Sequence, residues 1–523
     1  MARSLNILQF LFLATGSLTH SVTVAPNPVT GNTTTSTISW TDCSPDPSIA
    51  LKCANFSIPL DWSKPWGPQI NLGIGMIPAA NASQRIGYLM TNPGGPGGAD
   101  IQANGKGDLG LTVTGQYWRS SQLHQYFDIV GPDPRGVASS SPLECDPDLW
   151  TTASQTSLFP EDEESYNELV NAWKAAGESC AEKSGERLNH VDTLSVARDF
   201  EAIRIALGDE PMTFLGFSYG TQVGLQYAEL FPNDIRAMVL DAVLDHTQEE
   251  VYMLETESGG YEDTLDQFFL WCARNSSCAF HNTTDFPTKF DNYITAANQN
   301  PIPAPQCSNA SFDFYPCAST ASGYDILTFL QELLIVNRPD NGLGVPGLAD
   351  MSLLLQLAFE GNDASFFATA NTTSPISSDY PYTAVICQDW HHQSLSWPEF
   401  QTEMIFANII SPHTRGQGEF WRLQVRCMNW PAPVVNPAHS IAPTFQNLTL
   451  KTPVLLVNAF YDPETAYPFS VNLQRQFGER NAVLLSRNGS GHTSWYSMGD
   501  THFAINNYLI DLKVPQPATI LQS

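Results

Sequence analysis

The feature that most constrains the fold is an alternation of apolar strands and amphipathic helices that stops and later resumes. Strand-like segments occur at 86–91, 126–131, 212–217, 236–243, 452–460 and 481–486. Helical patterns lie between or after them at 190–208, 220–232, 466–478 and 500–512. Strands and helices alternating at this spacing predict a mostly parallel sheet with helices on both faces.

Between residues 246 and 440 the pattern is mainly helical. Four amphipathic segments lie there, at 261–273, 324–336, 349–360 and 397–410. A chain of 523 residues exceeds one ordinary core. One sheet with a helical insertion nevertheless explains the return of the strands better than three successive domains. We therefore predict an α/β sheet domain in two parts, 22–245 and 441–523, with a helical cap at 246–440.

Charge and motif content exclude several classes of function. The chain has 24 Lys and Arg against 53 Asp and Glu, a formal net charge of −29. Nucleic acid or an anionic membrane would require a basic patch, so neither is an expected partner. The sequence has no CxxC motif and no histidine cluster near its cysteines. We predict no metal and no cofactor, and the oligomeric state stays open.

The N-terminus has the form of a secretory signal peptide. Arg3 precedes an apolar run from Leu5 to Ala14, and small residues follow. The run is too short to span a membrane, and no later stretch reaches the length of a membrane span. The pattern predicts a signal peptide at 1–21, cleaved somewhere within 16–24, and a secreted, extracellular protein.

Cysteines and glycosylation sequons agree with secretion. Ten cysteines allow hundreds of pairings, so their connectivity does not follow from sequence. The simplest expectation joins neighbours in chain order: Cys43–Cys53, Cys145–Cys180, Cys272–Cys278, Cys307–Cys317 and Cys387–Cys427. Nine Asn-x-Ser/Thr sequons are expected glycan acceptors where exposed: Asn32, Asn55, Asn81, Asn275, Asn282, Asn309, Asn371, Asn447 and Asn488.

The pentad Gly-Phe-Ser-Tyr-Gly at 216–220 lies between a predicted strand and a predicted helix. Alone it is a weak signal, and an ordinary turn with a capping serine is the simpler alternative. A strand-to-helix turn is, however, the context of a nucleophile elbow. The two glycines let neighbouring backbone approach, and the helix N-terminus favours negative charge. We predict Ser218 as a nucleophile.

Acyl transfer also needs hydrogen-bond donors for the oxyanion. The segment Asn-Pro-Gly-Gly-Pro-Gly-Gly, 92–98, follows a predicted strand upstream of the elbow. A hydrolase sheet supplies one donor N–H from a loop at this place and the other from the residue after the nucleophile. Gly95 is the first candidate and Gly94 the second, and Tyr219 supplies the other N–H.

The order serine, acid, histidine of a hydrolase sheet directs the search for the base to the last strands. Asp462 follows the penultimate strand, while Asp241 and Asp245, at the end of the strand after the elbow, are the alternatives. His492 follows the last strand, and His502 is its nearest rival but lies in a predicted helix. We predict Asp462 as the acid and His492 as the base.

A histidine base works only when neutral, and its ordinary pKa is near 6.5. We therefore expect kcat/KM to fall on the acid side of about pH 6, unless the surroundings of His492 lower its pKa.

From about residue 43 to 510 the chain resembles the secreted tripeptidyl-aminopeptidase branch of the α/β-hydrolases, relatives of prolyl aminopeptidase. The resemblance is weakest over 280–370. It is carried by segments 92–98, 133–142, 216–232, 239–245, 386–390, 426–431, 452–467 and 489–492. Pro93 stands where prolyl aminopeptidases have histidine, and Ala138 and Asn458–Ala459 replace glycines that are usual in the family.

The resemblance implies that the chain hydrolyses peptides from a free N-terminus through an acyl-enzyme. Such an enzyme needs a carboxylate for the substrate's ammonium group. The candidates follow segment 239–245, although a solvated acidic helix face explains them equally well: Glu249, Glu250, Glu255 and Glu257. Two alternatives remain: a secreted carboxylesterase or lipase-like hydrolase with the same triad, and a non-catalytic binding protein with a hydrolase fold.

Overall fold

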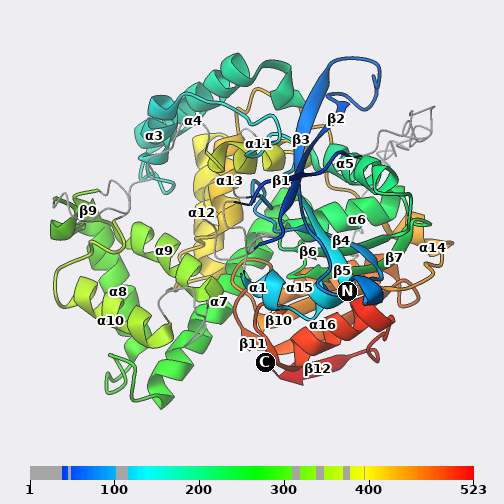
Figure 1. The fold of residues 1–523 in the computed structure, drawn as a ribbon. Helices are drawn as coiled ribbons and strands as arrows, with labels where there is room; N and C mark the ends of the chain where they lie inside the picture. Colours follow the sequence, from blue (N-terminus) through cyan, green and yellow to red (C-terminus); the bar gives the residue numbers. More distant parts are fainter. Residues whose placement is uncertain are drawn as a thin grey trace, which may run out of the picture.

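The computed structural model describes residues 38–44, 49–101, 116–308, 318–336, 347–368, 377–393 and 395–522. Its centre is a ten-stranded sheet in the order β1-β2-β3-β5-β4-β6-β7-β10-β11-β12 (Figure 1). The pairs β1–β2, β2–β3 and β3–β5 are antiparallel. Every later pair in the sheet is parallel. The predicted α/β-hydrolase sheet is therefore confirmed.

The strands of this sheet follow the apolar segments of the sequence. Their bounds are β1 Thr41–Asp42, β2 Lys52–Pro59, β3 Gln69–Ile77, β4 Gly87–Asn92, β5 Phe127–Pro132, β6 Met212–Phe217, β7 Ile235–Asp241, β10 Val454–Tyr461, β11 Ala482–Ser490 and β12 Thr519–Gln522. A separate two-stranded ribbon holds β8 Ile302–Pro303 and β9 Thr320–Ala321. Strand β12, after the last predicted helix, is an addition to the predicted sheet, and it pairs with β11.

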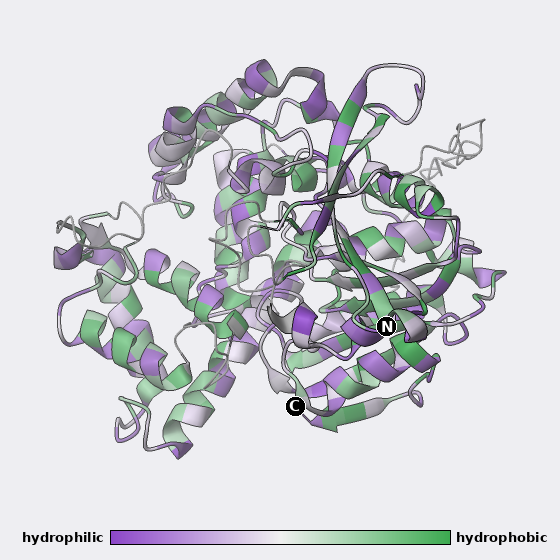
Figure 2. Ribbon diagram, in the orientation of Figure 1, coloured by the Kyte–Doolittle hydropathy of each residue, from purple (hydrophilic) through white to green (hydrophobic). Residues whose placement is uncertain are grey.

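Most helices outside the cap cover the sheet, whereas those at Pro147–Ser154 and Glu163–Ser184 lie beside the cap (Figure 1). The helices outside the cap are α1 Gln116–Ser120, α2 Leu123–Tyr126, α3 Pro147–Ser154, α4 Glu163–Ser184, α5 Thr193–Ala206, α6 Gly220–Leu230, α14 Ala442–Gln446, α15 Tyr467–Phe477 and α16 Gly499–Asp511. Short 3₁₀ turns occupy Ala82–Gln84, Gly185–Asn189 and Pro305–Ser308. Figure 2 shows that the central strands are mainly apolar, whereas the outer helices alternate between apolar and polar residues. Central strands are apolar because helices cover both faces of the sheet.

The segment between β7 and β10 is mainly helical, as predicted. It holds α7 Glu250–Arg274, α8 Phe286–Gln299, α9 Gly323–Val336, α10 Leu348–Phe359, α11 Asp379–Asp389, α12 Trp397–Ile410 and α13 Glu419–Cys427. Four of these match the predicted helices, although α7 begins at Glu250 rather than 261.

The cap consists of two packed parts. Helices α8 to α10 share their own apolar core with the second half of α7, centred on residues such as Phe290, Leu330 and Leu355. Helices α11 to α13 instead belong to the main core of the sheet, through residues such as Tyr380 and Trp421. Figure 1 shows the first part projecting to the left and the second lying between it and the sheet.

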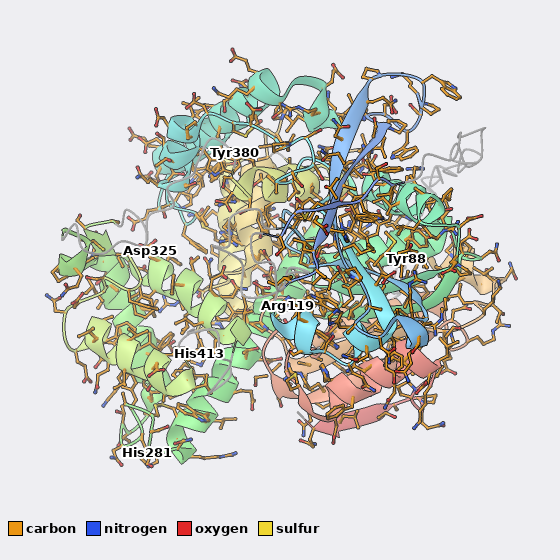
Figure 3. All side chains as sticks on the ribbon, viewed as in Figure 1. Tyr88, Arg119, His281, Asp325, Tyr380 and His413 are labelled. Carbon is orange, nitrogen blue, oxygen red and sulfur yellow. A yellow bond between two sulfur atoms is a disulfide. The ribbon has the colours of Figure 1, made fainter. Side chains whose placement is uncertain are left out.

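Helices that precede the elbow also pack on the cap. Trp150 of α3 lies edge-on to Trp173 of α4, with ring centres 5.2 Å apart, and to Tyr380 of α11, at 4.7 Å. Figure 3 labels Tyr380 at this junction. Helices from both sides of residue 218 in the sequence therefore pack against one another here.

Four predicted disulfides are present: Cys43–Cys53, Cys145–Cys180, Cys272–Cys278 and Cys387–Cys427. The last one joins α11 to α13 in the part of the cap nearest the sheet. The fifth predicted pair includes Cys317, which lies outside the described residues. Disulfides are typical of oxidising compartments, in agreement with the expected location.

The remaining predictions about secretion are tested only in part. The predicted signal peptide and Asn32, Asn309 and Asn371 lie outside the described residues. The other sequon asparagines are exposed or half-buried: Asn55, Asn81, Asn275, Asn282, Asn447 and Asn488. In the described part of the chain, no helix has the length and apolar character needed to cross a bilayer.

Candidate active site

Ser218 occupies a tight turn between β6 and α6, and its φ is +56°. A Cβ on Gly216 would stand 2.4 Å from the carbonyl oxygen of Gly220, and one on Gly220 would stand 2.6 Å from that of Asn92. These approaches explain why glycine flanks the serine on both sides. The Ser218 N–H donates to the carbonyl of Asp241 on β7, at 3.0 Å. The strained turn has the geometry of a nucleophile elbow.

Asp462 and His492 meet beyond the ends of β10 and β11. His492 Nδ1 lies 2.9 Å from both carboxylate oxygens of Asp462. That carboxylate is 1% exposed, and it also accepts the N–H groups of Glu464 and Thr465, at 3.0 and 2.9 Å. A carboxylate on Nδ1 selects the tautomer that leaves Nε2 free to act as a base.

His492 is buried, and its pKa is raised above the ordinary value. Burial alone would lower that pKa, but the charge of Asp462 and its hydrogen bond outweigh this effect. The charges of Glu419 and Asp241 raise it further. The surroundings therefore do not lower the pKa of His492, which was the condition for activity at more acidic pH.

The alternative acids and base have other partners. The carboxylate of Asp241 accepts the N–H groups of Ser494 and Trp495, at 2.9 and 2.7 Å. Asp245 accepts from Thr247, Gln248 and Asn472. His502, inside α16, contacts the carbonyl of Trp495 and the amide of Asn506. The geometry thus favours Asp462 and His492 over these alternatives.

The glycine-rich loop at 92–98 lies against the elbow. A Cβ on Gly94 would stand 2.9 Å from Ser218 Cβ and 3.3 Å from the backbone nitrogen of Tyr219. The Gly94 N–H donates to the side chain of Asn92, at 3.0 Å. Among the described residues, no acceptor lies on the N–H of Gly95 or of Tyr219. The first-choice oxyanion donors are therefore available, whereas the N–H of Gly94 is occupied.

Four glutamates from separate elements gather beside His492: Glu257, Glu332, Glu419 and Glu464. Glu464 Oε2 lies 3.3 Å from His492 Nε2. Burial raises the pKa of the Glu464 carboxyl well above its ordinary value, and the charges of the other three glutamates and Asp462 raise it further. The carboxyl group of Glu464 therefore holds its proton more tightly than that of an ordinary glutamate.

Glu257 lies deepest in this glutamate cluster. Its carboxylate accepts the N–H groups of Glu419 and Phe420, at 2.6 and 2.7 Å. Burial first, and then the charge of Glu419, raise the pKa of Glu257 to about 8, although these N–H groups act to lower it.

The other members of the cluster are reached by solvent. The side chains of Glu464 and Glu419 are 15% and 19% exposed, and Glu332 is exposed. Arg422 Nη2 lies 4.0 Å from Glu419, which also accepts a hydrogen bond from Tyr382. The glutamates outnumber the nearby arginine, so a cationic group entering from solvent would find favourable partners there.

The structure brings one of the four predicted amine-binding residues to this cluster. Glu249 is exposed immediately before α7, Glu250 is buried against His392, and Glu255 is half-buried on the first part of α7. Only Glu257 joins the cluster. Glu332, Glu419 and Glu464 were not predicted from the sequence. Only Glu464 could have been, because it lies two residues after the predicted acid Asp462.

One group of possible metal ligands occurs among the described residues: Cys387, His392 and Cys427. The two cysteines are joined in a disulfide, so their sulfur atoms are not available to a metal.

Comparison with known proteins identifies relatives over most of the chain. The family model of the alpha/beta hydrolase fold matches residues 89–288, and the model described as TAP-like protein matches residues 414–520. A serine protease of Mycobacterium tuberculosis, Hip1, is 29% identical over 486 residues, covering 87% of this chain and 85% of the relative.

Two further relatives carry different names. A tripeptidyl aminopeptidase of Streptomyces lividans is 28% identical over 481 residues, covering 87% of this chain and 80% of the relative. A carboxylesterase B of Mycobacterium tuberculosis is 26% identical over 471 residues, covering 89% of this chain and 85% of the relative.

Proposed function

We propose that this chain, which has the α/β-hydrolase fold, is a secreted serine hydrolase that releases short peptides or amino acids from the free N-terminus of oligopeptides. The proposal rests first on Ser218, His492 and Asp462, which stand on the turns where this fold places a triad. Relatives named serine protease and tripeptidyl aminopeptidase support peptides as the substrate.

In the proposed reaction, Ser218 Oγ attacks the scissile carbonyl while His492 Nε2 takes its proton. Asp462 holds the imidazole and stabilises the imidazolium that forms. The N–H groups of Gly95 and Tyr219 stabilise the oxyanion. His492 then returns the proton to the leaving amine, and water, activated by the same imidazole, hydrolyses the acyl-enzyme.

The observation that carries the exopeptidase proposal is the glutamate cluster of Glu257, Glu332, Glu419 and Glu464. Glu257 accepts the N–H of Glu419, and the side chains of Glu419 and Glu464 are partly open to solvent. Glu464 contacts the proposed base. An ammonium group placed among these glutamates would compensate the charges that, after burial, raise the pKa of Glu464. A free N-terminus would thereby anchor the peptide beside His492.

The test compares matched peptides with free and N-acetylated N-termini, using purified protein and a Ser218→Ala control. We expect cleavage of the free peptides only, with no cleavage by the control. Fragment masses then give the number of residues released per step. Equal cleavage of acetylated peptides would contradict the exopeptidase proposal and indicate an endopeptidase or a broad hydrolase.

The alternative activity is that of a carboxylesterase, which one relative's name suggests. Hydrolysis of a simple ester without cleavage of either peptide set would favour it. The glutamate cluster beside the base favours the peptide substrate, because an uncharged ester offers it no cation.

A further inference from the structure

The turn that carries His492 is held by an arginine of β11. Arg487 donates from Nη1 to the carbonyl of Ser490, at 3.0 Å, and from Nη2 to the carbonyl of Gly491, at 2.6 Å. Its Nε lies 3.2 Å from Ser494 Oγ, and Nη2 also lies 3.3 Å from the carbonyl of Thr493. A single guanidinium group therefore contacts the backbone or side chain of residues on both sides of the histidine.

Asp241 holds the same turn from the neighbouring side. Its two carboxylate oxygens accept the N–H of Ser494, each at 2.9 Å, and one also accepts the N–H of Trp495, at 2.7 Å. The backbone carbonyl of Asp241 accepts the N–H of Ser218. One residue at the end of β7 thus contacts both the elbow and the histidine turn.

Both side chains are buried, at 0% exposure for Asp241 and 3% for Arg487. The mechanism proposed above uses neither of them. Burial of a carboxylate and a guanidinium is costly unless their hydrogen bonds are satisfied. Here those hydrogen bonds go mainly to the short segment 490–495, so the cost is offset by contacts that fix its conformation.

We propose that Asp241 and Arg487 are positioning residues that hold the His492 side chain in a fixed position relative to Ser218. Asp241 supplies the link, because its carbonyl binds the nucleophile's N–H while its carboxylate binds the turn after the histidine. Arg487 closes the turn from the other side. The inference rests on the proposed serine hydrolase chemistry but not on the peptide substrate.

The chemistry of the contacts requires an aspartate at 241. Its carboxylate has only acceptors and faces two N–H donors. An asparagine of the same size would turn its NH₂ group toward one of these donors or leave that donor unpaired. The histidine turn would shift, while the fold of the sheet would lose a single hydrogen bond.

The test measures kcat and KM for a neutral ester with wild type, Asp241→Asn, Arg487→Lys and Asp245→Asn. Asp245 is the matched control, because it is buried at the same end of β7 and its hydrogen bonds avoid the histidine turn. We expect kcat to fall about 10- to 100-fold for Asp241→Asn, with KM within about threefold, because displaced catalytic groups weaken the transition state.

The pH profile separates positioning from a general loss of stability. Asp462, Glu419 and Asp241 all act to raise the pKa of His492. Glu464 lies 3.3 Å from its Nε2, the charge of Glu332 also acts on it, and Arg487 faces Asp241 from β11. Removing the charge of Asp241 should therefore move the acid limb of kcat/KM to lower pH. Asp245→Asn should leave that limb in place.

The inference is overturned if Asp241→Asn keeps the kcat and the acid limb of the Asp245→Asn control. If Asp241→Asn fails to fold, Arg487→Lys decides, since it keeps the charge but lacks the forked donors. An unchanged kcat in Arg487→Lys then overturns the inference. Ester hydrolysis by wild type without peptide cleavage would reject the proposed peptidase while leaving this inference open to the same test.

Discussion

Two groups of carboxylates near the site have opposite surroundings. Asp462 and Asp241, at the ends of the strands, are surrounded by N–H donors or an imidazole. Glu464, in the loop after β10, lies instead near glutamates of the cap, and burial first and then their charges raise its pKa. The first arrangement is complete without a ligand, whereas the second gains stability when a cation arrives.

This contrast suggests that the first group positions catalytic atoms and that the second group binds substrate. Carboxylates with matched donors fix atoms in place, so their loss should reduce the rate of the chemical step. Crowded carboxylates that solvent reaches bind a charged group, so their loss should weaken substrate binding. The following measurements separate the two effects.

The largest effect is expected for Asp462→Asn. An amide in place of this carboxylate would favour the wrong tautomer of His492 and leave the imidazolium without a counter-charge. We expect kcat to fall about 10⁴-fold for a free-amine peptide and for a neutral ester alike. A loss confined to the peptide would place Asp462 in substrate binding and break the comparison.

Glu257→Gln and Glu464→Gln should act on binding. We expect KM for a free-amine peptide to rise about tenfold in each, equivalent to about 1.4 kcal/mol, while KM for a neutral ester stays unchanged. Glu249→Gln, on the exposed residue before α7, is the matched control. An equal loss on peptide and ester would mean that these glutamates support the fold or the base rather than the amine.

The pH dependence of kcat/KM reports on His492. Since its pKa is raised, the neutral base is lost as the pH falls through a value above 6.5. We expect kcat/KM for the ester to fall about tenfold per pH unit below that value. An acid limb below pH 6 would show that burial outweighs Asp462.

The smallest effect concerns stability. Burial, the largest cause in each case, raises the pKa of Asp389 to about 7 and of Asp241 to about 6. Both values exceed those of the unfolded chain, so the native state binds more protons between about pH 4 and 7. Stability is therefore greatest at the acid end of this window and falls as the pH rises.

Thermal unfolding at pH 5 and pH 8 tests this expectation. We expect Tm to be higher at pH 5 by about 2–5 °C. Asp389→Asn should reduce the difference, because it removes one of the two carboxyl groups that bind protons more tightly in the folded state. A Tm that rises with pH would contradict the inferred direction.

Prediction from sequence worked where the signal was local. The elbow was identified from glycines two residues either side of Ser218 at a strand–helix junction, and the structure shows the close contacts that require them. The helix predicted at 190–208 is present as α5, and the side chain of its N-cap, Asp192, accepts the N–H of Ser195. Chain-order disulfides were also confirmed for four pairs, because each joins segments that are neighbours in the sequence.

Prediction was weaker where residues meet from distant elements. Three of the four proposed amine-binding glutamates lie away from the cluster, since proximity to β7 in sequence does not place a side chain at the site. Asp241 was considered only as an alternative acid, and nothing in its sequence indicated that it faces Ser494 across the strand ends.

The sequence by itself indicated the alternating strands and helices on either side of a helical insertion, the elbow and the Asp462–His492 pair, because periodicity, turn chemistry and chain order act over short distances. Only the tertiary structure decided that Glu257 of α7, Glu419 of α13 and Glu464 after β10 share one cluster, and that Asp241 and Arg487 enclose the histidine turn. These groups interact through space, by charge and burial, so their separation along the chain does not predict that they meet.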